Sequence, residues 1–198
     1  MSTQTLDPRV RRTRKLLKQA FVELMHEKGF NAMTVQDIAD RADINRTTFY
    51  DHYEDKFALH DQMILEWFQQ KLADYTITQD ATFCGDNLRN LIYAVCDFVL
   101  QMNGGCHGAD LQYKPAIEDL MQATIQDIVH SWMTSLDGIE HADIHAASIS
   151  YAIFGAGMQW SKDQTHSKGT VADTLISLIR DGLKAQVTNL PELVTQSA

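Results

Sequence analysis

Hydrophobic residues recur at helical spacing along most of the 198-residue chain, and no segment alternates strictly between apolar and polar positions as a half-buried strand does. The first predicted helix runs from about Arg9 to Lys28, with Asp7 and Pro8 at its start and Gly29 as a left-handed cap at its end. Further helices are expected near residues 34–42, 46–53, 56–75, 85–102, 115–136, 142–162 and 170–187. The pattern therefore predicts an all-α protein.

The segment from residue 34 to residue 56 predicts two very short helices joined by a tight turn. Thr34 is a good N-cap, and Asp37 follows three residues later as the acid of a capping box. Asp43 interrupts the apolar stripe as a turn residue, and Asn45 is a second good N-cap. This is the outline of a DNA-reading helix-turn-helix.

The second short helix is expected to bury Phe49 and Tyr53 and to expose a face rich in hydrogen-bond donors. That face carries Arg46, Thr47, Thr48, Tyr50, Asp51 and His52. Arginine pairs bidentately with guanine, threonine offers a hydroxyl and a methyl, and tyrosine and histidine reach phosphates or base edges. One good bidentate pair discriminates by only about 1–3 kcal/mol, so a second copy of the helix is expected on the DNA.

With these features, the sequence TVQDIADRADINRTTFYDHYEDKFAL resembles the N-terminal DNA-binding domain of the TetR/AcrR family of one-component transcriptional regulators. The resemblance covers about the first sixty residues. It implies a three-helix DNA-binding domain with a helix-turn-helix in residues 1–55, and a C-terminal helical bundle for effector binding and dimerisation in residues 56–198. The family usually has glycine where this chain has Asp43; because aspartate tolerates a left-handed conformation, the turn is expected to persist.

Carried over residue by residue, the family pattern puts Thr34, Tyr50 and Lys56 on phosphates. The full set of expected DNA-binding residues is Thr34, Gln36, Arg46, Thr47, Thr48, Tyr50, His52 and Lys56. Asp51 fits least well, because a carboxylate facing DNA is repelled unless it accepts a hydrogen bond from cytosine. The alternatives left open are that Tyr50 is mainly a packing residue and that His52 is a capping or solvated histidine.

The charge of the chain is segregated. The net charge of −9 divides into +1 for residues 1–56 and −10 for the remainder. Residues 9–18 contain six basic residues and no acid, namely Arg9, Arg11, Arg12, Arg14, Lys15 and Lys18. This cluster suits phosphates that flank the groove, and the acidic remainder would repel DNA and help to orient the protein on it. The alternative for the cluster is a solvated basic helix start.

The last two predicted helices are the expected site of a homodimer. Ala152, Gly155, Ala156 and Gly157 permit close backbone approach, and the final helix has a broad apolar stripe. That stripe is formed by Leu175, Ile176, Leu178, Ile179 and Leu183, and Ile149, Ile153, Phe154 and Trp160 flank the small residues. Two such helices from each subunit would make a four-helix bundle, which the family resemblance also implies. The alternative is packing within one chain.

A small-molecule effector is implied by the resemblance, and the middle helices offer candidate contacts. These are Tyr93, Met102, His107, Tyr113 and Trp132. The alternative is that such methionine and aromatic residues form the core. The segment from Asn103 to Lys114, which holds Cys106 and His107, is a candidate gate.

The sequence disfavours several functional classes of protein. Catalytic fingerprints such as GxSxG, a P-loop and HExxH are missing, so no enzyme and no cofactor are expected. The pairs Cys106–His107 and His141–His145 are weak metal hints without an evident third ligand, so no metal is expected. Neither a signal peptide nor an apolar run of membrane length is present, which favours the cytoplasm.

The sequence as a whole predicts a DNA-binding transcriptional regulator. The specific form expected is a repressor that binds a palindromic, double-stranded operator as a homodimer and is released by a small effector. The alternative is a regulator of the same kind that is controlled by a protein partner and has no small effector.

Overall fold

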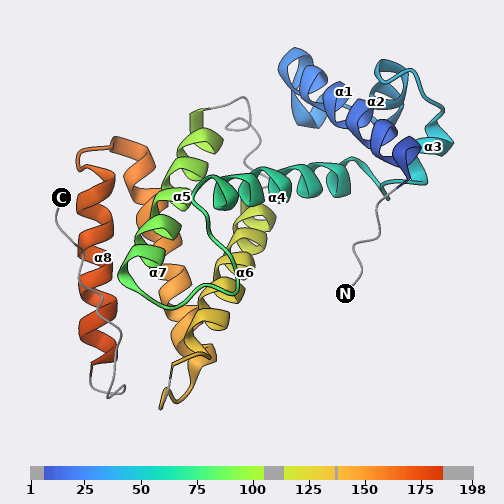
Figure 1. Cartoon of the computed structure of the whole chain (residues 1–198). Coiled ribbons are helices and arrows are strands. Elements are labelled where there is room, and N and C mark those ends of the chain that lie inside the picture. The colour runs from blue at the N-terminus through green and yellow to red at the C-terminus, as the bar shows by residue number, and fades with distance from the viewer. Residues whose placement is uncertain (1–6, 105–113, 137, 185–198) are drawn as a thin grey trace. The chain divides into compact units, whose positions relative to one another are not determined.

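A computed structural model describes residues 7–104, 114–136 and 138–184. That part of the chain forms eight helices and no strand, which confirms the all-α prediction (Figure 1). The helices are α1 (Pro8–Ala32), α2 (Val35–Arg41), α3 (Arg46–Tyr50), α4 (Lys56–Asp74), α5 (Gly85–Gly104), α6 (Lys114–Met133), α7 (Ala142–Asp163) and α8 (Lys168–Leu183).

The helices fall into two compact units that divide within α4, between Ile64 and Leu65. The first unit contains α1 to α3 and the start of α4, and the second contains the rest of α4 with α5, α7, α8 and α6 from Pro115. The sequence placed the domain boundary between residues 55 and 56, where α4 begins, and that boundary stays a prediction.

Local signals set the ends of α1. The Asp7 side chain accepts a hydrogen bond of 2.8 Å from the backbone N–H of Arg9, and Pro8 occupies the first turn. Gly29 interrupts the helix with φ 74° and ψ 168°, a backbone conformation that is almost confined to glycine. The break occurs where the sequence predicted the helix to stop.

The first unit closes around apolar side chains from three helices. Phe21 and Phe30 of α1 have ring centroids 6.0 Å apart, and Phe49 of α3 is fully buried. Leu17 and Ile38 are also fully buried, which places one face of α1 and one face of α2 in the same core. This core holds the two short helices in place, since helices of seven and five residues are too short to be stable alone.

In the second unit α5 is the central helix, in contact with both α7 and α8. Its residues from Leu88 to Val99 are largely buried. Gly157 of α7 lies against α5 so closely that a Cβ at this position would be 3.0 Å from a methyl carbon of Val95. Phe68 of α4 packs on Phe98 of α5, with ring centroids 5.2 Å apart.

Part of the stripe assigned to the dimer packs within the chain instead. Ile149, Ile153 and Gly157 are buried, and so is most of the apolar face of α8, formed by Leu175, Ile176, Ile179 and Leu183. For these residues the alternative of intrachain packing is the one the structure shows. Of the predicted stripe, Ala152, Gly155 and Leu178 remain exposed, and Ile144 and Tyr151, which the sequence analysis did not include in it, are exposed on α7 as well.

The tail from residue 189 and the candidate gate at residues 105–113 lie outside the described residues. Each described helix is too short or too polar to cross a lipid bilayer.

Candidate nucleic-acid interface

The N-terminus of α2 carries the predicted capping box. The Thr34 hydroxyl accepts a hydrogen bond of 3.1 Å from the backbone N–H of Asp37, whose carboxylate accepts one of 2.8 Å from the backbone N–H of Thr34. Two free donors of the first turn are thereby satisfied. Exposed Gln36 follows on α2 and donates to Asp40 one turn later.

The turn between α2 and α3 also forms as the sequence predicted. Asp43 has φ 54°, so it takes the left-handed conformation that glycine usually supplies at this position in the family. The Asn45 side chain then accepts a hydrogen bond of 2.8 Å from the backbone N–H of Thr47 and caps α3. Helix α3 itself ends at Tyr50, three residues before the predicted end.

Helix α3 separates its buried and exposed side chains in the predicted way. Phe49 and Tyr53 are buried, whereas Arg46, Thr47 and Tyr50 are exposed. Thr48 and His52 are half-buried. The exposed face of α3 thus presents hydrogen-bond donors over about one and a half helical turns, and these donors can face a groove of DNA.

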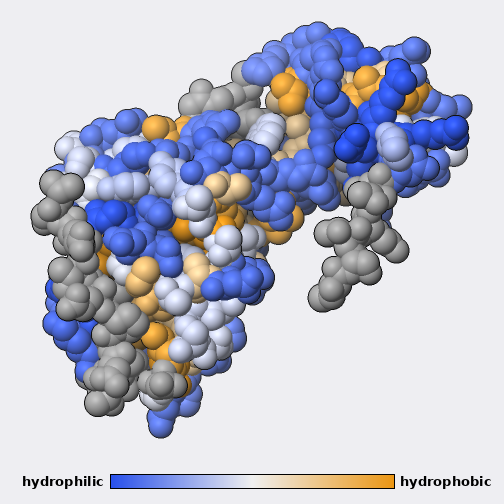
Figure 2. Space-filling view, viewed as in Figure 1, coloured by the Kyte–Doolittle hydropathy of each residue, from blue (hydrophilic) through white to orange (hydrophobic). Residues whose placement is uncertain are grey.

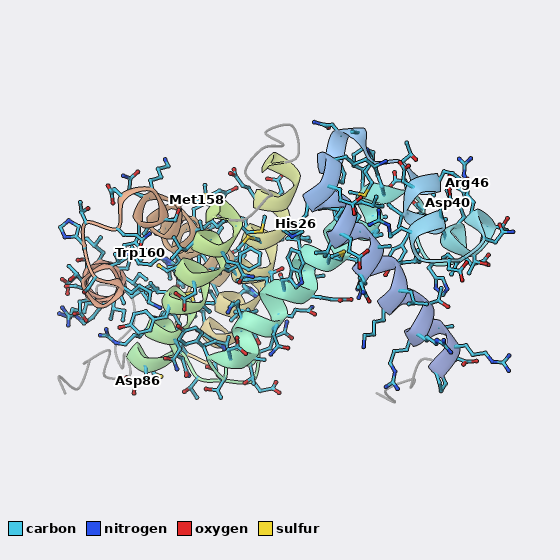
Figure 3. All side chains as sticks on the ribbon, turned by 90° about the horizontal axis from the view of Figure 1, so that it is seen from above. His26, Asp40, Arg46, Asp86, Met158 and Trp160 are labelled. Carbon is cyan, nitrogen blue, oxygen red and sulfur yellow. The ribbon has the colours of Figure 1, made fainter. Side chains whose placement is uncertain are left out.

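Arg46 and Tyr50 form a pair on that open face. The Arg46 guanidinium lies 5.5 Å from the centroid of the Tyr50 ring, and its nitrogens donate to the Tyr50 hydroxyl at 3.0 and 3.3 Å. Arg46 projects outward from α3 (Figure 3). The stacking holds the Arg46 guanidinium in one orientation. Less side-chain conformational entropy is therefore lost when the guanidinium pairs with a base or a phosphate.

Lys56 makes contacts that the sequence did not predict. Its ammonium donates to the backbone carbonyls of Phe30 at 2.9 Å and Met33 at 2.7 Å, with a longer contact of 3.4 Å to that of Asn31. The Nζ atom also lies 4.6 Å from the centroid of the Phe30 ring. Lys56 thus satisfies carbonyls that the end of α1 leaves open, and its contact with a phosphate stays a prediction.

Ion pairs tie α2 to α1. Arg41 forms two hydrogen bonds with Glu27, at 2.8 and 2.7 Å, and one with Glu23 at 3.2 Å. The hydrogen bond from Arg41 lowers the pKa of Glu27. The hydrogen bonds from Lys28 and Thr34 hold the pKa of Asp37 far below its usual range. Glu27, Lys28, Asp37 and Arg41 also line a polar cleft with Leu24 and Asp40, so these four charges are already paired with one another.

Comparison with known proteins supports the same reading. The model of the tetR family of bacterial regulatory proteins matches residues 17–63, which run from α1 into α4. The uncharacterized HTH-type transcriptional regulator YxbF of Bacillus subtilis is 43% identical over 60 residues, which are 30% of this chain and 16% of that protein. Residues 17–63 therefore carry the DNA-binding region of the TetR family. The matched family and YxbF are both described as regulators.

Solved structures agree in fold with this chain. The dihydroxyacetone kinase operon activator DhaS superposes with a TM-score of 0.56 at 16% identity, covering 88% of this chain and 98% of that one. A TetR-family regulator from Streptomyces coelicolor gives a TM-score of 0.57 at 14% identity, covering 87% and 83%. At such identities the likeness concerns the fold alone. The chain spans only 16% of the length of its curated relative YxbF, and the two are similar only in the DNA-binding region.

The structure brings most of the expected DNA-binding residues to one short stretch of the TetR-family domain. Thr34 and Gln36 stand at the start of α2, and Arg46, Thr47, Thr48, Tyr50 and His52 belong to α3 or the turn after it. Their contacts with DNA stay predictions. The sequence analysis missed the partners of Lys56 and Arg41, which lie 14 to 26 residues away along the chain, and no local pattern signals such pairs.

The candidate effector residues that the structure describes lie on α5 and α6. Trp132 is fully buried and its indole N–H donates to the carbonyl of Thr78 at 2.8 Å, so it is a satisfied core residue. Tyr93 is half-buried beside Tyr75, with ring centroids 6.2 Å apart, and Met102 is half-buried near the end of α5. His107 and Tyr113 lie outside the described residues. An effector contact by any of the five stays a prediction.

The histidine and cysteine pairs add no metal centre to the described part of the chain. Three or more His, Cys, Asp or Glu side chains do not converge anywhere in it. His141 precedes α7 in a left-handed conformation, and Cys106 and His107 fall outside the described residues. The expectation of no metal stays a prediction.

Proposed function

We propose that this protein is a cytoplasmic transcriptional repressor that binds a palindromic operator as a homodimer. The observation that carries the proposal is the exposed face of α3, where Arg46 and Tyr50 stack and Thr47 lies open beside them. One such face reads only a few base pairs, so two copies must meet half-sites one helical turn, about 34–36 Å, apart.

Unpartnered apolar surface on α7 and α8 supports the homodimer. Tyr151 and Leu178 are each 66% exposed, and Ile144 is 58% exposed. Around Gly155 and Gly182 a Cβ atom would meet nothing within 4 Å, so another backbone could approach there. Exposed large apolar side chains on two neighbouring helices are typical of an interface between subunits.

Control by a small effector is part of the proposal. An effector that binds the second unit more tightly in one conformation would shift the population of subunit arrangements and so change the spacing of the two α3 helices. The competing version of the proposal is a regulator of the same kind that is controlled by a protein partner and binds no small effector. Thermal unfolding with candidate compounds separates the two, because an effector raises the melting temperature with its concentration relative to Kd.

Selection of bound sites from random double-stranded DNA, with the assembly state of the protein recorded in parallel, tests the proposal. The expected result is an enriched palindrome bound by a dimer. Binding without enrichment of any sequence at low salt would overturn it. A reporter placed downstream of the selected site then measures the sign of regulation, which is pertinent because the structural neighbour DhaS is described as an operon activator.

A further inference from the structure

A lysine ammonium lies between two tyrosine rings in the second unit. The Nζ atom of Lys168, the first residue of α8, is 5.4 Å from the centroid of the Tyr93 ring and 5.9 Å from that of the Tyr75 ring. The two rings meet edge to face, with centroids 6.2 Å apart. Attraction between a cation and an aromatic ring extends to about 6 Å, so both rings contribute to holding the ammonium.

Hydrogen-bond acceptors complete the surroundings of this ammonium. It donates to the Asp97 carboxylate at 2.6 Å and to the Tyr75 hydroxyl at 3.3 Å, and that hydroxyl donates to the other oxygen of Asp97. Tyr93 and Asp97 lie about one turn apart on α5, whereas Tyr75 directly follows α4. Tyr75, Tyr93 and Asp97 thus form an ammonium cage, in which two rings and a carboxylate from separate elements converge on one cation.

Other charges near the cage leave its carboxylate to an ammonium. Arg89 of α5 approaches the Tyr93 hydroxyl at 3.5 Å, but it forms an ion pair with Asp173 of α8 and so does not compete for Asp97. Hydrophilic side chains cover much of the second unit on the face seen in Figure 2, and the chain from residue 57 onward carries a net charge of −10. Such a charge raises the local concentration of cations.

Lys168 can leave the cage without unfolding the helix that carries it. The Ser167 side chain caps α8 by accepting a hydrogen bond from the backbone N–H of Thr170, so the start of the helix does not depend on the lysine side chain. The side chains of Lys168 and Asp97 are 31% and 29% exposed, so the cage is open to solvent. The flexible lysine stem lets the ammonium move from the carboxylate into water.

We infer that the ammonium cage binds a protonated primary amine, which takes the place of the Lys168 ammonium. The inference rests on the proposed function, because it names the chemical class of the effector. Two aromatic rings and a carboxylate select a cation, and the oxygens of Asp97 and Tyr75 favour an ammonium with N–H donors over a quaternary one. Displacement of Lys168 also separates α8 from Tyr75, at the end of the helix that continues into the first unit.

The first test titrates the full-length protein with n-butylammonium chloride, whose cation copies the lysine side chain, and follows the melting temperature. Sodium chloride at equal concentration corrects for screening, and tetramethylammonium chloride supplies a cation without N–H donors. A saturable rise is expected for butylammonium, with a roughly millimolar Kd because the ligand is small, and a smaller rise for tetramethylammonium. Equal curves for the three salts would overturn the inference.

Three variants test displacement of Lys168. Lys168→Ala removes the internal competitor and should bind butylammonium about tenfold more tightly than wild type does. Lys162→Ala removes an exposed lysine of α7 and is the matched control, with an unchanged Kd. Asp97→Asn removes the anion of the cage, so the saturable response should disappear. Equal Kd values for wild type and Lys168→Ala would contradict displacement, and the comparison of salts on wild type stays valid if a variant fails to fold.

DNA binding separates this inference from the proposed function. Butylammonium should weaken binding of wild type to a selected site more than sodium chloride of equal concentration does, and Asp97→Asn should not show this difference. Butylammonium that binds the protein but leaves its affinity for DNA unchanged would overturn the effector assignment. If the proposed function itself failed, no selected site would emerge, whereas the melting temperature would still respond to butylammonium.

Discussion

At the scale of single residues, Lys56 is the side chain whose structural position differs most from its expected role. Its ammonium points at carbonyl groups where α1 ends, so it links the start of α4 to the turn that precedes α2. The family resemblance put the same lysine on a phosphate. Both roles need the positive charge, but only the first is required for folding.

Replacing Lys56 by methionine is therefore expected to destabilise the first unit. The change keeps the apolar stem and removes the charged hydrogen bonds to the Phe30 and Met33 carbonyls, at a cost of about 2 kcal/mol in the free energy of unfolding. Denaturant unfolding followed by circular dichroism measures that free energy. Lys56→Arg is the control, because it retains the charge and part of the hydrogen bonding. An unchanged stability of Lys56→Met would contradict the capping role.

At the scale of helices, a polar cluster joins three elements of the second unit. Lys168 of α8 donates to Asp97 of α5 at 2.6 Å, and the hydroxyl of Tyr75, which follows α4, donates to the other oxygen of Asp97. Burial opposes ionisation of Asp97, but the hydrogen bonds from Lys168 and Tyr75 outweigh burial and lower the pKa of its carboxyl group. The end of α4 is thereby fixed to α5 and α8.

Asp97→Asn is expected to lower the free energy of unfolding by about 1–2 kcal/mol at pH 7, because the half-buried ammonium of Lys168 loses its anion. A carboxyl group with a lowered pKa stabilises the fold above its unfolded pKa, near 4, and this stabilisation is lost as the pH falls through the folded pKa. The difference between wild type and variant should therefore shrink below about pH 4. Urea unfolding between pH 3 and 7 measures it, with exposed Asp80→Asn as control. A difference that does not vary with pH would contradict the role of Asp97.

The same elements show which parts of the fold the sequence could predict. Caps and turns depend on residues within a few positions, so Thr34 and Asn45 were identified as N-caps from the sequence alone and each caps its helix as predicted, and Gly29 breaks α1 where the sequence predicted the helix to stop. The cluster around Asp97 could not be identified in this way. Its partners lie 22 and 71 residues away along the chain, and their meeting depends on how α4, α5 and α8 pack.

The faces of α7 and α8 show a second limit of prediction from sequence. Apolar spacing identifies an apolar stripe but does not say whether the neighbour that covers it belongs to the same chain. Ile153 and Gly157 turned inward onto the core, while Leu178 stayed exposed. Only the packed structure divides such a stripe into core and surface.

At the scale of the whole molecule, the exposed apolar side chains of α7 and α8 are expected to hold two subunits together. Tyr151→Glu with Leu178→Glu should produce a monomer, because two charges would be buried at the interface without partners. The affinity for a palindromic site should fall at least a hundredfold, since each half-site is then bound alone. Sedimentation equilibrium at micromolar concentration measures the assembly state. Ala123→Glu, on an exposed position of α6, is the control and should remain a dimer. A monomeric wild type would contradict the dimer.

The central claim is that the exposed face of α3 reads DNA sequence. The most direct measurement is the ratio of affinities for a selected site and a scrambled site at one salt concentration, for wild type and for Arg46→Ala/Thr47→Ala. Wild type should prefer the selected site by about a thousandfold or more. The variant should lose at least tenfold of that preference without loss of stability, because both side chains are exposed and the Asn45 cap uses only the backbone of Thr47. An unchanged ratio would contradict the claim.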